Sequence, residues 1–82
     1  MIRVAVRFFA QIRDKAGVSE LALELPPEST VAYAAQDLEQ QFPQIIGLLP
    51  RTAFAVNMTK VDVNTILRDG DELALLPPVS GG

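Results

Sequence analysis

Two segments near the start of the chain, residues 2–8 and 20–25, place a large apolar residue at every second position. This is the period of a β-strand with one buried face. If the two strands pair antiparallel with position numbers that sum to 27, Arg3 faces Glu24 on one side and apolar residues face one another on the other. One register therefore satisfies both faces of the sheet. The same register pairs Arg7 with Glu20, Ala5 with Ala22, Ile2 with Leu25, Val4 with Leu23 and Val6 with Leu21.

The spacing of apolar residues predicts two helices. Residues 10–16 carry such spacing and precede Gly17, a residue typical of the position after a helix, so a short helix is expected there. Ser29 or Thr30 is a natural N-cap for a longer helix over residues 31–41. Its apolar stripe, which would lie across the sheet, consists of Val31, Ala34, Ala35, Leu38 and Phe42.

The second half of the chain predicts further strands. Residues 54–57 and 60–61 have strand character, and residues 72–76 form a last strand after the Asp69-Gly70 turn signal. Residues 45–50 are apolar but interrupted, so they predict at most a turn of helix at the edge of the core.

The order strand, strand, helix and further strands defines the fold class. One main amphipathic helix covers one face of a mixed sheet, which is an α+β arrangement. The strands at residues 2–8 and 72–76 are apolar along much of their length, so we expect them to be parallel neighbours in the centre of the sheet. This plan is the β-grasp, or ubiquitin-like, fold, with a domain over residues 1–76 and an extended tail over residues 77–82.

Composition excludes several chemistries. A chain of 82 residues has room for one small domain. It contains no Cys and no His, which removes thiol nucleophiles, imidazole bases and the usual ligands of zinc and iron–sulfur clusters. The net charge of −3, without a Lys/Arg cluster, argues against nucleic acid or an anionic membrane as partner. Since the sequence shows neither a signal peptide nor a membrane-spanning run, we expect a cytoplasmic protein. We also expect no bound metal or cofactor.

The C-terminal residues are the candidate functional element. Pro77 and Pro78 favour extended backbone, and Gly81 and Gly82 bring no side chain that would obstruct a narrow passage. Six extended residues reach about 20 Å, far enough to place the α-carboxylate of Gly82 inside a partner's pocket. The alternative interpretation is a frayed terminus, or a glycine remnant of processing or cloning.

Four motifs together resemble a known family, the small subunit of molybdopterin synthase (the MoaD type). The resemblance lies in residues 8–13 (FFAQIR), 55–57 (AVN), 67–72 (LRDGDE) and 77–82 (PPVSGG). It covers nearly the whole chain, and the last six residues are its most specific part. Asp14, where members often carry Glu, is a conservative departure.

The resemblance implies a sulfur carrier rather than an enzyme. In this family an ATP-using enzyme of the MoeB type, similar to ubiquitin activators, adenylates the terminal glycine carboxylate, here that of Gly82, which is then converted to a thiocarboxylate. The tail is expected to enter the large subunit of the synthase, the MoaE type, and to give sulfur to cyclic pyranopterin monophosphate. Acid–base residues are expected on that large subunit. The partner-contacting residues of the tail would be Pro77, Pro78, Val79 and Ser80, with Gly81 beside the reacting end.

Other classes stay open. A carrier of the thiamine type, or a modifier that tags lysines, would use the same activated glycine and differ in its acceptor. A plain interaction module would not need Gly82 at all. Phe9 and Leu76 fall on the helix-free face near the root of the tail, where they are either a partner-docking patch or ordinary surface residues. Residues 69–72 lack the spacing of a calcium loop and predict a turn.

Overall fold

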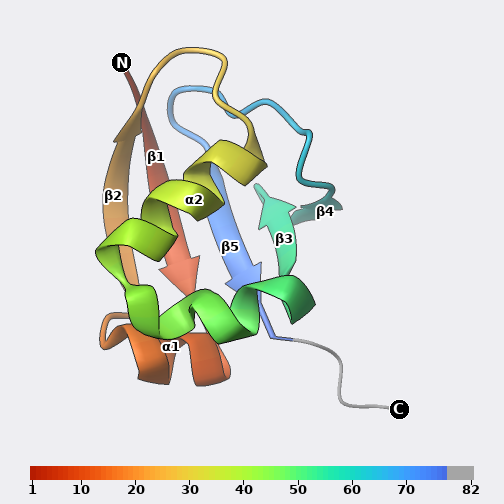
Figure 1. Ribbon diagram of the computed structural model, residues 1–82. Coiled ribbons are helices and arrows are strands. Elements are labelled where there is room, and N and C mark those ends of the chain that lie inside the picture. Colours follow the sequence, from red (N-terminus) through yellow and green to blue (C-terminus); the bar gives the residue numbers. More distant parts are fainter. Residues whose placement is uncertain (78–82) are drawn as a thin grey trace.

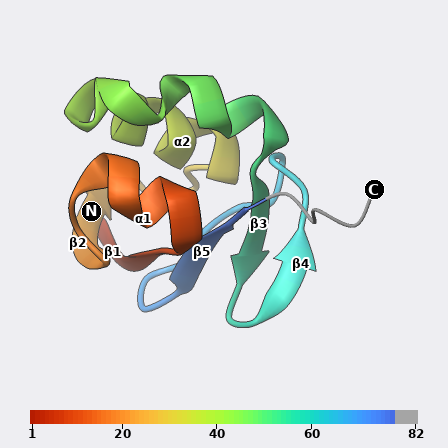
Figure 2. The same ribbon diagram turned by 90° about the horizontal axis from the view of Figure 1, so that it is seen from below.

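A computed structural model of the chain describes residues 1–77. Five strands form one mixed sheet in the order β2-β1-β5-β3-β4. The helices lie on one side of this sheet, and within the described part of the chain no helix covers the other side (Figures 1 and 2). The α+β arrangement is therefore the expected one. The elements are β1 (Ile2–Phe8), α1 (Ala10–Ala16), β2 (Glu20–Leu25), α2 (Val31–Gln41), the 3-10 helix η1 (Pro43–Arg51), β3 (Ala53–Val56), β4 (Thr59–Val61) and β5 (Glu72–Leu76).

The strand pairing confirms the predicted register. β1 and β2 are antiparallel, with Arg3 opposite Glu24 and the other pairs as expected. β1 and β5 are parallel, with Phe8 opposite Leu75. β5 also pairs antiparallel with β3, so the strand that precedes the tail is held on both sides. The C-terminal end of β5 thus has a fixed position, at the end of the strands where α1 lies (Figure 1).

The core lies between the sheet and the helices. Val4, Val6 and Phe8 of β1 meet Leu73 and Leu75 of β5, and all five are buried. Burial of each such large side chain stabilises the fold by about 1.5–3 kcal/mol. The core is completed by Ile12, Ala16, Leu23, Leu25, Val31, Ala34, Leu38, Ile45, Phe54 and Leu67.

Helix α2 has the predicted bounds. Its N-cap is Thr30, whose Oγ1 accepts a hydrogen bond from Tyr33 N at 3.2 Å. The other candidate, Ser29, is buried and donates its hydroxyl to Pro26 O at 2.6 Å. Phe42 follows the helix as its C-cap and packs edge-on against Phe8, with ring centroids 5.7 Å apart. The apolar stripe therefore extends one residue past the helix.

Two segments differ from expectation. The interrupted apolar run, expected to give at most a turn of helix, lies within the nine-residue 3-10 helix η1, which buries Ile45 completely. Strand β3 runs over Ala53–Val56, one residue earlier at each end than expected. It ends there because Asn57, at φ 51°, already belongs to a turn.

Candidate functional site

A groove on the helix-free face of the sheet lies beside the end of β5; we call it the tail-root groove. Its volume is about 310 Å³. Phe9 continues the alternation of β1 by one residue with an extended backbone, and Leu76 is the last residue of β5, so both fall on the helix-free side. The two apolar side chains predicted to share a patch therefore line one groove. The full lining is Arg7, Phe9, Ala55, Met58, Glu72, Ala74 and Leu76.

Small side chains leave the space for this groove. Ala55 and Ala74 sit opposite each other on neighbouring strands, and Ala74 in turn sits opposite Arg7. A larger residue at either alanine would fill the hollow. The sheet therefore offers an apolar recess directly beside the strand that leads to the tail.

Arg7 is the principal charged group of the groove. Its guanidinium carbon lies 5.5 Å from the centroid of the Phe9 ring, a cation–π arrangement. Its Nε and Nη1 atoms lie 4.0 Å from Glu20 Oε2 and 3.9 Å from Glu72 Oε2, respectively. All three charged side chains are partly exposed, so these pairs contribute less than about 1 kcal/mol each. They position Arg7 but leave it accessible to a partner.

The tail itself is described only at its first residue. Pro77 is half-buried and follows β5 directly. The other tail residues singled out by the sequence, Pro78, Val79, Ser80, Gly81 and Gly82, lie outside the described residues. Their roles stay predictions.

The structure brings together two of the motifs on which the resemblance rests. Asn57, at the end of the AVN motif, donates from Nδ2 to Asp71 Oδ1 at 2.9 Å and accepts from Glu72 N at 3.0 Å. Asp71 also accepts from Arg68 N through Oδ2 at 2.8 Å. The pair thus ties the β3–β4 hairpin to the start of β5. Sequence reasoning did not place Asn57 and Asp71 in contact, because they are 14 residues apart and belong to different turns.

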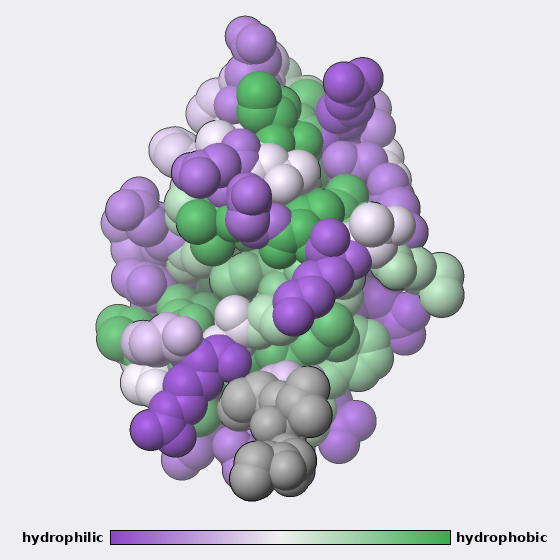
Figure 3. Space-filling view, turned by 90° about the vertical axis from the view of Figure 1, so that its right-hand side faces the viewer, coloured by the Kyte–Doolittle hydropathy of each residue, from purple (hydrophilic) through white to green (hydrophobic). Residues whose placement is uncertain are grey.

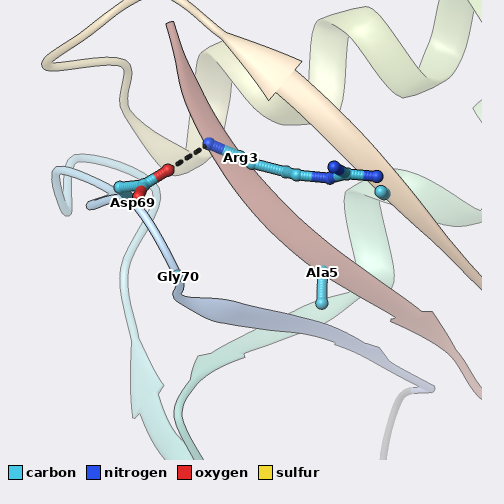
Figure 4. Close-up of a pocket in the computed structure, with 5 residues that line it drawn as sticks. Arg3, Ala5, Asp69 and Gly70 are labelled. Carbon is cyan, nitrogen blue, oxygen red and sulfur yellow. Dashed lines mark hydrogen bonds between the residues drawn. The ribbon is translucent and has the colours of Figure 1, made fainter.

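A second hollow lies further along the same sheet face, over Arg3, Ala5, Ala22, Asp69 and Gly70 (Figure 4). Asp69 Oδ1 accepts a hydrogen bond from Arg3 N at 2.8 Å, and Gly70 N donates to Arg3 O at 2.9 Å. Gly70 adopts φ 88°, which a glycine tolerates without strain. The predicted turn is therefore confirmed, and it is fastened to the start of β1. Across residues 1–77, no three acidic side chains gather as metal ligands would.

The helix side of the molecule carries an apolar groove that was not predicted from the sequence. It lies between α2, η1 and β3, where Ile46 and Val63 are 49% and 43% exposed over the buried Phe54. Figure 3 faces the β3–β4 edge of the molecule, where apolar surface gathers between polar rims. The sequence did not predict this groove because the apolar residues of η1 follow no regular period. None of the helices in the described part of the chain is long and apolar enough to cross a membrane.

These features define a class of protein: a ubiquitin-like β-grasp domain whose central strand lies beside an apolar groove and is followed directly by the C-terminal residues. The model of the ThiS family matches residues 6–82, and the chain belongs to that family. A molybdopterin synthase sulfur carrier subunit from Escherichia coli is 37% identical over 83 residues, which cover 96% of this chain and 99% of the relative. The resemblance noted from the sequence is thereby confirmed.

Solved structures agree with the fold. The small archaeal modifier protein 1 of Methanosarcina acetivorans superposes with a TM-score of 0.86 and 27% identity, covering 100% of this chain and 98% of that one. A chain from a complex of subunits 1 and 2 of the molybdopterin-converting factor of Helicobacter pylori superposes with a TM-score of 0.72 and 29% identity, covering 99% and 100%. The β-grasp prediction is confirmed.

Proposed function

We propose that this chain is the sulfur carrier subunit of a molybdopterin synthase. The observation that carries the proposal is the full-length similarity to carriers of that name, as in the Escherichia coli relative. The composition supports it, because a chain with neither Cys nor His has no side chain suited to hold sulfur or to act as an imidazole base. The α-carboxylate of Gly82 is then the place for the chemistry.

The proposed reaction activates that carboxylate in two steps. A carboxylate is a poor electrophile, so the activating enzyme, of the MoeB type, first joins it to AMP from ATP and releases pyrophosphate. A sulfide equivalent then attacks the acyl carbon and AMP leaves, which gives the thiocarboxylate. The sulfur of this group then forms a C–S bond to the pterin precursor, cyclic pyranopterin monophosphate, as a C–O bond of that precursor breaks and its oxygen leaves. Water finally hydrolyses the acyl–sulfur bond, which returns the carboxylate of Gly82 and leaves the sulfur on the pterin. ATP is used by the activating enzyme, and this chain holds no cofactor of its own.

The described residues supply rigidity and docking in this proposal. β5 is paired on both sides, so the tail starts from a fixed point of the sheet. Phe9 and Leu76 offer apolar contact beside that point, and Pro77, which has no backbone N–H to donate, follows the strand directly. The partner for this surface is the large subunit, of the MoaE type, which would also supply the acid–base groups. The complex of subunits 1 and 2 from Helicobacter pylori supports such a pairing.

Mass spectrometry of the carrier tests the proposal. Arg68 is the last Lys or Arg of the chain, so trypsin releases residues 69–82 as one C-terminal peptide. After purification from cells with the native biosynthetic genes, this peptide should be heavier by the difference between sulfur and oxygen. A variant that lacks Gly82 is the control and should show no shift. An unmodified peptide from cells that supply the activating enzyme and sulfur would contradict the proposal.

A second function, conjugation to lysines of other proteins, is favoured by the similarity to the small archaeal modifier protein 1. This reaction would use the same activated Gly82 but form an isopeptide bond. After tryptic digestion, a conjugated target would carry residues 69–82 on a lysine side chain. Detection of such a branched peptide would add this function, and its absence alongside a thiocarboxylate would leave sulfur transfer alone.

A further inference from the structure

Met58 lies at the tip of the β3–β4 hairpin, and it is almost fully exposed. It is 92% exposed, and its backbone lies in the left-handed region at φ 71°. Val56 pairs with Thr59, so Asn57 and Met58 are the two central residues of a tight hairpin turn. In such turns both central residues have positive φ, and glycine is favoured at the second. A methionine here is strained and gains little burial in return.

The turn is nevertheless held firmly. Asn57 tolerates the left-handed region and is bound through its side chain to Asp71 and to the backbone of Glu72. Its own backbone N also donates to Glu72 O at 2.9 Å. The neighbouring Met58 is therefore presented from a fixed position. An exposed apolar side chain on an ordered turn is suited to binding, because the backbone that carries it loses little conformational freedom on contact.

Met58 also lines the tail-root groove with Phe9 and Leu76. Phe9 follows β1 and Met58 follows β3, which are the two strands on either side of β5. Because β3 runs antiparallel to β5, Met58 lies toward the start of β5, whereas Phe9 and Leu76 lie at its end. The three side chains therefore mark a surface that crosses the central strand diagonally.

We propose that Met58 is a docking contact of the carrier, inserting into an apolar pocket of the large subunit. The inference rests on the proposed function and adds to it a contact at the far end of the docking surface. The large subunit is the favoured occupant because the groove extends to Leu76, directly before the tail, so a protein that receives the tail comes close to this groove. A flexible, polarizable thioether adapts well to such a pocket.

The test compares matched variants of the full chain. Met58→Asn keeps a residue that tolerates the turn but removes the apolar side chain. Glu28→Asn makes the same kind of change at another left-handed position, φ 68°, outside the groove lining. Met58→Leu retains an apolar side chain. Each is titrated against the large subunit encoded in the same genome by isothermal titration calorimetry, and its Tm is measured by circular dichroism.

The affinity for the large subunit and the Tm should respond differently to these substitutions. Met58→Asn should raise the Kd for the large subunit about tenfold or more, as expected for loss of a buried apolar side chain, while its Tm is unchanged or higher. Glu28→Asn should bind like the wild type, and Met58→Leu should bind within about threefold of it. If the wild type binds and Met58→Asn binds equally well, the proposed role of Met58 is refuted, while the proposed function of the chain stands. If the wild type itself does not bind, the proposed function fails and the inference fails with it.

Discussion

Replacement of Asn57 by Ala should destabilise the domain more than a change at an exposed residue usually does. The variant loses two side-chain hydrogen bonds, of 2.9 Å to Asp71 and 3.0 Å from Glu72 N. Because both bonds are solvent-exposed, each contributes about 0.5–1 kcal/mol. The alanine must also keep a φ near 51°, which costs about 1 kcal/mol for a residue with a Cβ. The total loss is about 2–3 kcal/mol.

Thermal and urea unfolding followed by circular dichroism would measure this loss. For a domain of this size, 2–3 kcal/mol lowers Tm by about 8–24 °C. Asn57→Gly is the matched control, since glycine accepts the left-handed turn and loses only the hydrogen bonds, so its loss should be about half as large. An Asn57→Ala variant within about 0.5 kcal/mol of the wild type, at an unchanged urea m-value, would show that the contact with Asp71 does not hold the hairpin.

Three further outcomes are expected. Leu73→Ala should lower the free energy of unfolding by about 2–5 kcal/mol in a urea titration, because Leu73 is fully buried in the central strand; a loss below 1 kcal/mol would contradict that packing. Leu76→Lys should weaken binding to the large subunit about tenfold in calorimetry with only a small change in Tm, whereas a large fall in Tm would assign Leu76 to the core. Deletion of Gly82 should abolish thiocarboxylate formation, measured on the C-terminal tryptic peptide, and leave Tm unchanged; sulfur transfer by that variant would overturn the carrier chemistry.

Where two independent signals coincide, the sequence was sufficient to predict the fold. The register of β1 and β2 follows from apolar alternation on one face and from opposite charges at Arg3 and Glu24 on the other. The start of α2 follows from the capping preference of Thr30 together with the apolar stripe. The shared groove of Phe9 and Leu76 follows because both continue alternating strands that lie parallel.

Where tertiary contacts overrule local preference, the sequence was not sufficient. In η1, Gly47 and Pro50 interrupt every regular period, and the helix is held by the complete burial of Ile45. The turn at Asn57 and Met58 lacks the usual glycine, so strand propensity alone extended β3 too far. Met58 could be added to the groove only once that hairpin geometry was known.

The position of β5 has a consequence for incomplete chains. It is the last strand in chain order among the described residues, yet it lies between β1 and β3 in the sheet. A product truncated before Glu72 would leave both neighbours without a partner and would lack the core residues Leu73 and Leu75. Such a product cannot close its sheet and would be cleared by proteolysis, so it would not occupy the large subunit as a tailless competitor. The strand order therefore couples folding to the presence of β5, because only a chain that extends to the base of its tail acquires a folded docking face.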